Sequence, residues 1–248
     1  VVTAVLALGV QRMARRNAIV RRLPAVETLG SATIVASDKT GTLTRNEMTV
    51  RAVVTASGRV AVGGSGYSPD GEIRREPDVA ESAGNHQKKV QGALQTELER
   101  ALTIGDRASN AVLQENDGHW TVQGDPTEGA LLVAARKAGL KKGTLDARFE
   151  RVGEIPFSSK RKLMTTIHVD AHAQMKKRML VFTKGAPDVL LGRCSFELVG
   201  KETERLTEKR RTAILKQNEE LASEALRSLG VAFRSMPTDE IQPNGIDE

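Results

Sequence analysis

The sequence predicts an α/β protein, because apolar runs of strand length alternate with longer stretches of helical periodicity. Residues 32–36 (Ala-Thr-Ile-Val-Ala) are one such run and predict a buried strand that ends at Ser37. Residues 125–139 start with Asp-Pro, a capping residue followed by proline at the first helical position, and predict a helix that stops at Gly139. Residues 207–229 predict a long amphipathic helix.

The composition fits a globular body with an aliphatic core. Of the 248 residues, 39% are hydrophobic and 27% are charged, which allows one large domain or two smaller ones. Aromatic residues make up only 3%, so aliphatic side chains must fill the core. The single Cys194 excludes an internal disulfide and fits a reducing, cytosolic setting. His168 and His172 are four residues apart, but their surroundings are typical of a strand, so no metal site is expected there.

The formal net charge of +6 is concentrated at the start of the chain. Five arginines stand in the first 22 residues without an acid, and no RNA- or DNA-reading module is recognisable, so we expect no nucleic-acid partner. Residues 1–10 are almost wholly apolar and precede these arginines, as at the inner end of a membrane helix that runs into the cytosol. Ten residues are too few to cross a bilayer, and an ordinary amphipathic helix is the alternative. The absence of an initial Met indicates a piece of a longer protein.

The elements that follow the first strand alternate in type. Residues 46–62 predict strands with a turn at Gly58. Residues 63–71 are rich in glycine but lack the Lys-Ser/Thr ending of a Walker loop, so we expect a hairpin or surface loop. Residues 74–92 are polar and are expected to be mobile, and residues 90–116 predict a helix.

The second half of the chain predicts most of the sheet. Residues 149–168 predict a strand, a basic turn and a second strand, and residues 176–182 predict a third. A helix is expected to begin near Pro187. Residues 229–233 predict the last buried strand, and residues 235–248 are a polar tail.

Asp38 opens the string Asp-Lys-Thr-Gly-Thr-Leu-Thr directly after the first predicted strand. An aspartate at the carboxyl end of a buried strand can present a nucleophile, and the amides of a Thr/Gly loop can surround a phosphoryl group. Aspartate carboxylates are the nucleophiles of ATPases that pass through an aspartyl-phosphate. The string resembles the phosphorylation signature of the P-type (E1-E2) cation-transporting ATPases.

The resemblance extends over nearly the whole chain. Residues 1–50 are similar to the exit of the fourth membrane helix and the phosphorylation loop of type II P-type pumps, most of all the calcium pumps. Four later strings occur in the family's order and resemble its nucleotide-binding domain. They cover residues 124–131 (Gly-Asp-Pro-Thr-Glu-Gly-Ala-Leu), 157–164 (Phe-Ser-Ser-Lys-Arg-Lys-Leu-Met), 184–188 (Lys-Gly-Ala-Pro-Asp) and 226–234 (Leu-Arg-Ser-Leu-Gly-Val-Ala-Phe-Arg).

This resemblance implies a nucleotide-binding domain with a twisted antiparallel sheet flanked by helices. It also implies the first strand of a Rossmann-like phosphorylation domain of the haloacid-dehalogenase type. The expected parts are a basic stub at the cytosolic end of a membrane helix (1–22), a piece of the phosphorylation domain (23–48), the nucleotide-binding domain (49–240) and a returning tail (241–248). Two hinge strands, near residues 44–50 and past residue 237, would let the nucleotide-binding domain tilt ATP towards Asp38.

The resemblance assigns the chemistry of phosphoryl transfer to the signature. Asp38 would be the phosphorylated nucleophile and, with Thr40, would bind Mg²⁺; Lys39 belongs to the same catalytic string. A related phosphatase family places a second aspartate two residues after the nucleophile, where this chain has Thr40. This difference favours a phosphoenzyme that persists, as a pump requires.

The resemblance assigns ATP to the later strings. Phe157 would stack on adenine, with a core phenylalanine as the alternative, and Lys162 would reach the phosphates. Glu128 would hydrogen-bond near the adenine edge. The remaining assignments are Lys184, Gly185 and Ala186 in the adenosine pocket, and Arg227 at the phosphates or ribose unless it is a solvated charge at a helix end.

One departure concerns the basic turn. Ser159 stands where the family often has arginine, so a phosphate contact is missing or Lys160 replaces it. Otherwise Lys160 and Arg161 are expected to be solvated. Asp188 is expected to cap the following helix, and Trp120 is expected to serve in packing.

The function implied is that of the ATP-binding cytosolic part of an ATP-driven cation pump that forms an aspartyl-phosphate at Asp38. The 248 residues contain no Thr-Gly-Asp and no Gly-Asp-Gly-x-Asn-Asp segment, which complete this chemistry in the family. We therefore expect the chain to bind ATP without turnover. Its partners would be ATP with Mg²⁺ and the rest of the same pump. The chain would lie on the cytoplasmic side of a membrane, and other segments of the pump would cross that membrane. The alternatives are a soluble aspartate-nucleophile phosphatase and a non-catalytic nucleotide-binding module.

Overall fold

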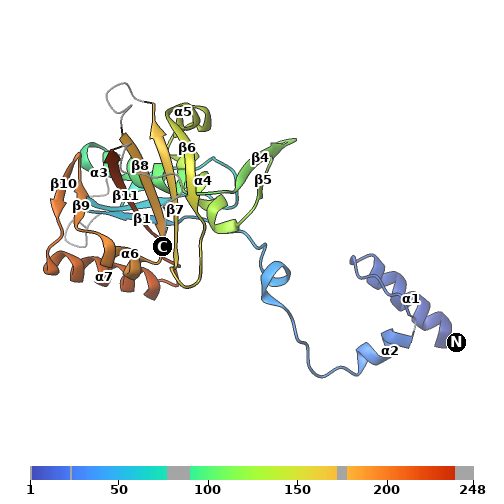
Figure 1. The fold of residues 1–248 in the computed structure, drawn as a ribbon. Helices are drawn as coiled ribbons and strands as arrows, with labels where there is room; N and C mark the ends of the chain where they lie inside the picture. Colours follow the sequence, from blue (N-terminus) through green and yellow to red (C-terminus); the bar gives the residue numbers. More distant parts are fainter. Residues whose placement is uncertain (1, 23, 77–89, 172–177, 238–248) are drawn as a thin grey trace. The chain divides into compact units, whose positions relative to one another are not determined.

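The computed structural model describes residues 2–22, 24–76, 90–171 and 178–237, which form two compact units (Figure 1). The first unit comprises Val1–Asn46 and the second Glu47–Glu248. The expected tail 241–248 and most of the polar stretch 74–92 lie outside the described residues.

The first unit contains α1 (Val2–Ala14), α2 (Pro24–Gly30) and the wide turn η1 (Lys39–Leu43). None of its described residues is buried. The strand predicted over residues 32–36 is wrong, because this segment has no regular structure and Ile34 and Val35 are exposed. A strand needs a neighbour for its backbone hydrogen bonds, and the described part of this unit contains no other strand. The Rossmann-like start of a phosphorylation domain is therefore not formed here.

The second unit is built on a four-stranded antiparallel sheet with the order β11-β8-β7-β6. Its strands are β6 (Phe149–Ile155), β7 (Leu163–Asp170), β8 (Arg178–Gly185) and β11 (Gly230–Pro237). The predicted strand, basic turn and strand over residues 149–168 are confirmed. The last strand was expected to be buried, but β11 lies at an edge of the sheet and its residues are only partly covered.

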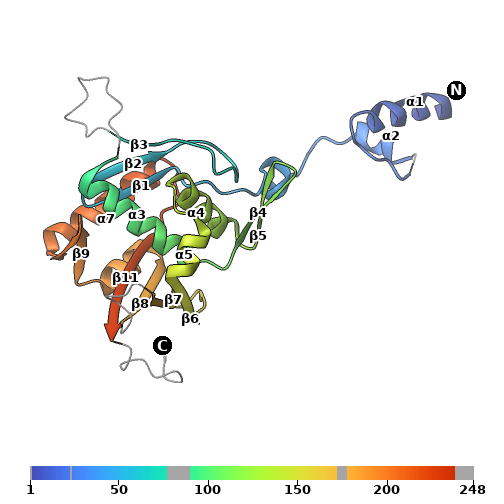
Figure 2. The same ribbon diagram turned by 90° about the horizontal axis from the view of Figure 1, so that it is seen from above.

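Two long helices form the middle layer of this unit. They are α3 (Gly92–Arg107) and α4 (Pro126–Lys137), and Figure 2 shows them between the four-stranded sheet and a second sheet. The second sheet is β1-β2-β3, formed by Ala52–Thr55, Gly58–Val62 and Ile73–Arg75. The expected turn precedes Gly58, which itself begins β2. The glycine-rich stretch after β2 is a loop, as predicted.

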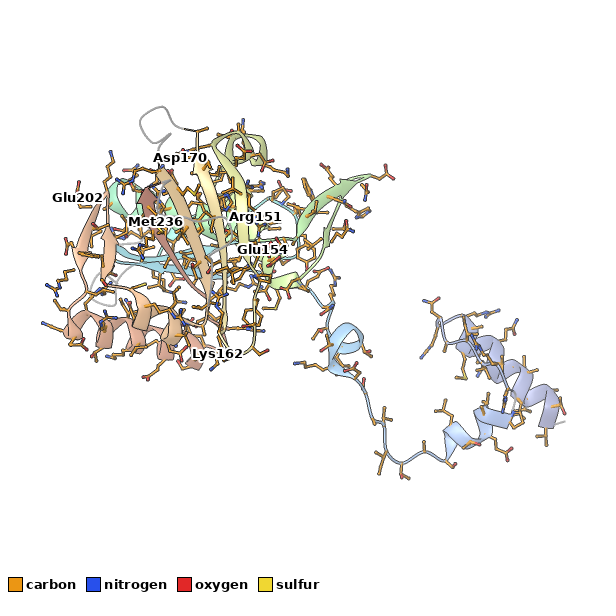
Figure 3. All side chains as sticks on the ribbon, viewed as in Figure 1. Arg151, Glu154, Lys162, Asp170, Glu202 and Met236 are labelled. Atoms are coloured by element: carbon orange, nitrogen blue, oxygen red, sulfur yellow. The ribbon has the colours of Figure 1, made fainter. Side chains whose placement is uncertain are left out.

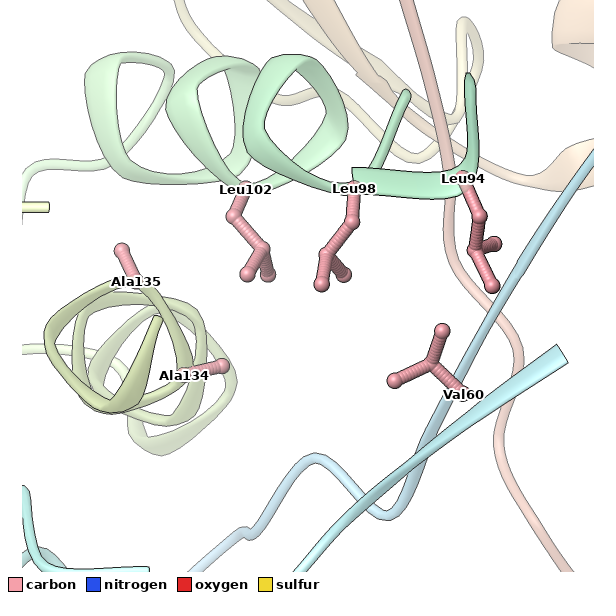
Figure 4. Close-up of a cluster of buried hydrophobic side chains, with 6 residues drawn as sticks. All are labelled: Val60, Leu94, Leu98, Leu102, Ala134 and Ala135. Atoms are coloured by element: carbon pink, nitrogen blue, oxygen red, sulfur yellow. The ribbon is translucent and has the colours of Figure 1, made fainter. Parts of the chain in front are cut away.

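The core lies on both sides of α3. Towards the second sheet, leucines spaced four residues apart on α3 pack against α4 and β2, because this spacing places them on one face of the helix (Figure 4). This cluster consists of Val60, Leu94, Leu98, Leu102, Ala134 and Ala135. Towards the four-stranded sheet, the next turn of α3 packs on aromatic and aliphatic strand residues. That cluster consists of Ile104, Ala108, Leu145, Phe149, Leu180 and Phe182.

The predicted helix over residues 90–116 is wrong in its last third. The helix ends at Arg107, and Val112–Asn116 is a strand, β4, paired with β5 (His119–Gln123). The backbone amides of Asn110 and Ala111 donate to the Glu128 carboxylate, which draws this segment away from the helix. A residue on another helix therefore decides where α3 stops.

The remaining elements lie around this body. They are α5 (Lys142–Arg148), α6 (Pro187–Arg193), the hairpin of β9 (Phe196–Val199) and β10 (Glu202–Arg205), and α7 (Glu208–Ser223). The helix expected near Pro187 is confirmed as α6. The long helix expected over residues 207–229 stops at Ser223, because Ala225 adopts a left-handed backbone with φ +59°. Neither α5 nor the β9–β10 hairpin was predicted from the sequence.

Candidate functional site

The motif residues of the second unit gather at one end of the four-stranded sheet. At this end β6 and β8 finish and β7 and β11 begin, since Leu163 pairs with Gly185 and Gly230 also pairs with Gly185. In Figure 3, Lys162 lies at this end, whereas Asp170 and Met236 lie at the opposite one. We call it the Gly185 end of the sheet.

The backbone at Gly185 is packed against the start of β7. A Cβ atom at Gly185 would lie 2.9 Å from the Leu163 Cα and closer still to the Lys162 carbonyl oxygen. The next amide, of Ala186, donates to that same carbonyl at 3.1 Å. Lys162 itself has a left-handed backbone (φ +56°) and donates its amide to the Ser158 carbonyl at 2.7 Å. These bonds hold the turn between β6 and β7 against the end of β8.

Lys184 is the penultimate residue of β8, which runs further than the strand predicted over residues 176–182. Its side chain is buried, with the residue 7% exposed, and its Nζ lies 2.8 Å from Glu128 Oε1 and 3.0 Å from Ser109 Oγ. Burial lowers the pKa of Lys184, and the bond to Glu128 opposes that change. A buried cation with two acceptors provides a fixed donor whose third proton can meet a ligand.

Glu128 is held in place by its own helix and by the chain before β4. Its Oε2 accepts from the amides of Asn110 at 2.7 Å and Ala111 at 2.9 Å. Asp125 caps α4 by accepting from the amides of Thr127 and Glu128, as the Asp-Pro start predicted. The carboxylate thus has three partners and is aimed at Lys184.

Phe157 is not a core residue. It is the second residue after β6, and 60% of it is exposed. A flat apolar ring that remains in water is suited to stack on a planar ligand. Trp120, in contrast, lies on β5 opposite Glu115 and is partly buried, as expected of a packing residue.

Arg161 was expected to be solvated, but it is partly buried. Its Nη2 donates to Thr165 Oγ1 at 3.3 Å, and this hydroxyl lies 3.1 Å from Thr183 Oγ1 on the adjacent strand. Its Nη1 is shielded from solvent and has no hydrogen-bond partner among the described residues. Lys160 is exposed, as expected.

Two of the other predicted residues are exposed cations, and a third lies in the first turn of α6. Lys162 and Arg227 are exposed, and Arg227 stands three residues before Gly230 at the same end of the sheet. Asp188 does not cap α6, whose N-cap is Ala186; it lies in the first turn, where a carboxylate still favours the helix dipole.

A polar network that the sequence did not predict lies beside this site. Asn110 donates to Glu154 Oε1 at 2.8 Å and accepts from Arg151 at 2.7 Å, and Arg151 also pairs with Glu154 at 2.8 Å. Ser109, which bonds Lys184, belongs to the same segment. No motif contains these residues, so only their position before β4 and along β6 could have indicated them.

Asp38 belongs to the other compact unit. Its Oδ1 accepts from the Thr40 amide at 3.3 Å, and the Thr44 amide closes the turn by donating to the Lys39 carbonyl at 3.0 Å. The Asp38 carboxylate and the Thr40 carbonyl are oxygen donors of the kind that Mg²⁺ prefers. Two donors in an exposed loop do not make a complete site, and the described residues contain no group of three or more His, Cys, Asp and Glu that could hold a metal.

Comparison with known proteins identifies the family. Residues 97–248 match the family described as "P-type ATPase, cytoplasmic domain N", which is more than half of the chain. The chain belongs to the P-type ATPases. All the residues gathered at the Gly185 end of the sheet fall within the matched part of this P-type ATPase domain.

Individual P-type ATPases are similar over almost the whole chain. A calcium-transporting ATPase of Bacillus subtilis is 40% identical over 240 residues, 97% of this chain and 25% of that protein. The cation-transporting ATPase pma1 of Synechocystis is 41% identical over 236 residues, and calcium-transporting ATPase type 2C member 1 of Bos taurus is 38% identical over 233. The chain spans about a quarter of the length of these relatives. None of the helices in its described ranges is long and apolar enough to cross a membrane.

Proposed function

We propose that this chain binds ATP at the Gly185 end of the four-stranded sheet and serves as the ATP-binding part of a cation pump. One observation carries the proposal. A buried Lys184–Glu128 pair lies next to a backbone stretch that tolerates no side chain at Gly185, and an exposed Phe157 ring stands in the adjoining turn. The family match supports the same ligand, because it covers the cytoplasmic domain N.

Each residue of the site has a task that its environment allows. Phe157 stacks on the adenine ring, a contact worth about 1–3 kcal/mol per base. Lys184 and Glu128 hydrogen-bond the adenosine from a fixed position, and Gly185 with Ala186 lets it approach the backbone. Lys162 and Arg227 are exposed cations that reach the phosphates.

An ATP titration of the whole chain tests this site. Phe157→Ala and Lys184→Met should each weaken ATP binding by about tenfold, as loss of about 1.4 kcal/mol of contact would. Phe196→Ala is the matched control, because Phe196 is equally exposed (59%) but lies on the β9–β10 hairpin. Binding should persist without Mg²⁺, since these residues hold the adenosine. Unchanged affinity in both variants, or a strict need for Mg²⁺, would remove the proposed site.

In the parent pump, we propose that Asp38 is the phosphorylated residue. One carboxylate oxygen would form a bond to the γ-phosphorus of ATP while the bond to the bridging oxygen breaks and ADP leaves. Mg²⁺, held in part by Asp38 and Thr40, would neutralise the transferred charge. The names of the relatives favour calcium as the transported cation. The partners would be the other domains of the pump, and the chain would lie on the cytoplasmic side of the membrane.

A further inference from the structure

Helix α7 leads into the loop that carries Arg227, yet none of its described residues is buried. It packs on α6, itself a short helix of seven residues. Apolar burial therefore fixes the ends of α7 only weakly, and polar contacts must define where the following loop begins.

One ion pair fixes the carboxyl end of α7. Arg59 on β2 donates from Nη1 and Nη2 to the two carboxylate oxygens of Glu224, at 2.6 Å each. Glu224 is the C-cap residue of α7. The Nε of Arg59 also lies 2.7 Å from Glu76 Oε2, which fixes the direction of the guanidinium plane. A two-pronged pair of this kind defines orientation as well as distance.

The loop that follows is held at its other end by close packing. After Glu224 the chain turns through Ala225, and the Leu226 amide donates back to the Leu221 carbonyl at 3.1 Å. At the far end, Gly230 pairs with Gly185, and a Cβ atom there would lie 3.2 Å from the Pro187 Cα. The loop therefore has two fixed ends, and Arg227 projects from it.

Arg227 is exposed and has no hydrogen-bond or ion-pair partner among the described residues. An unpaired arginine retains its full donor set for a ligand, but its long side chain gains affinity only if its backbone is held in one place. We propose that Arg59 is a positioning residue for ATP binding: through Glu224 it holds the loop 225–229 so that Arg227 faces the bound nucleotide. This inference rests on the proposed function.

The chain contains a matched control at the other end of the same helix. Arg210 also makes a two-pronged pair, donating from Nε and Nη2 to the two carboxylate oxygens of Glu197 at 2.6 Å each, and its side chain is similarly exposed (30% against 29% for Arg59). That pair ties the start of α7 to β9 and leads to no site residue. A purely structural role would make the two pairs equivalent.

The experiment measures ATP affinity and melting temperature of the whole chain with Arg227→Ala, Arg59→Met, Arg210→Met and the double variant Arg59→Met/Arg227→Ala. We expect Arg227→Ala to weaken ATP binding about five- to tenfold, and Arg59→Met to reproduce most of that loss. The double variant should be no weaker than Arg227→Ala alone. Arg210→Met should leave affinity within about twofold of the parent chain while it shifts the melting temperature as much as Arg59→Met does.

Several outcomes would overturn the inference. If Arg59→Met and Arg210→Met lose ATP affinity equally, the Arg59–Glu224 pair contributes to the stability of the fold and does not position Arg227. Additive losses in the double variant would show that Arg59 does not act through Arg227. An unchanged affinity in Arg227→Ala, with Phe157→Ala still impaired, would reject the positioning role but keep the ATP site. If every site variant keeps its ATP affinity, the proposed function itself is rejected.

Discussion

Gly185 is the position where a single atom decides whether the proposed site can form. Gly185→Ala would press a methyl group into the backbone of Lys162 and Leu163, which cannot move without breaking the β7–β8 pairing. We expect urea unfolding to show a loss of at least about 2 kcal/mol of unfolding free energy. An ATP titration should show loss of ATP binding.

The matched variant is Gly192→Ala on α6, where an added Cβ meets nothing within 4 Å. It should be neutral or stabilise by up to about 1 kcal/mol, because alanine favours a helix over glycine. Equal stability of the two variants would contradict the close packing at Gly185.

His168 makes stability depend on pH. It is buried against Phe182, its Nε2 lies 2.9 Å from Thr166 Oγ1, and burial lowers the pKa of the imidazole to about 4. The unfolded chain, with an ordinary value near 6.5, binds the proton first as the pH falls. The free energy of unfolding is therefore highest above about pH 6.5, and it falls by about 2–3 kcal/mol as the pH drops to about 4.

Replacing His168 tests this dependence of stability on pH. Between about pH 7 and about pH 4.5, the unfolding free energy of His168→Gln should fall less than that of the parent chain by about 2 kcal/mol. His119→Gln, on the exposed part of β5, should behave like the parent. Parallel pH profiles for the parent chain and His168→Gln would exclude a buried neutral imidazole.

At the scale of elements, Glu97 joins two hairpins to α3. Its carboxylate, 3% exposed, accepts from the amide and hydroxyl of Ser57 in the β1–β2 turn and from the Gly200 amide in the β9–β10 turn. Burial raises the pKa of Glu97 but these donors outweigh it, so the pKa lies below its ordinary value. Glu97→Ala would leave buried donors without an acceptor and should cost about 3 kcal/mol in denaturant unfolding.

Hydrogen exchange locates that effect. The amides of Ser57 and Gly200 should exchange faster in Glu97→Ala, whereas Glu99→Ala, an exposed change on the same helix, should leave them protected. If both amides retain their protection in Glu97→Ala, the carboxylate does not hold the hairpins.

The elements differ in how far local sequence decides them. The start of α4 was predicted from Asp125 and Pro126, because a cap and a starting proline act within one turn. The end of α3 was not predictable in the same way. It depends on the Glu128 carboxylate, which arrives from a later helix and captures the amides of Asn110 and Ala111.

At the scale of the whole molecule, Asp38 of the signature and the proposed ATP site belong to different compact units. The described part of the first unit buries no residue, so nothing in it shields or desolvates the Asp38 carboxylate as phosphoryl transfer requires. We expect the 248-residue chain, incubated with γ-labelled ATP and Mg²⁺, to bind nucleotide but to form no acid-stable label. Label that appears on Asp38 and disappears in Asp38→Asn would contradict this.

The sequence by itself determined the family and the strands on either side of the basic turn, because motif spacing and local caps are properties of the chain. It also supplied Phe157, Lys162 and Lys184 as the residues of the proposed ATP site. It also predicted a strand at residues 32–36 that does not form, since a strand depends on a neighbour that local sequence cannot supply. Only the tertiary structure showed the partners: Ser109 and Glu128 at Lys184, the partly buried Arg161, and Arg59 at the end of α7. These contacts join residues far apart in the chain, and the packing of helices and sheets brings them together.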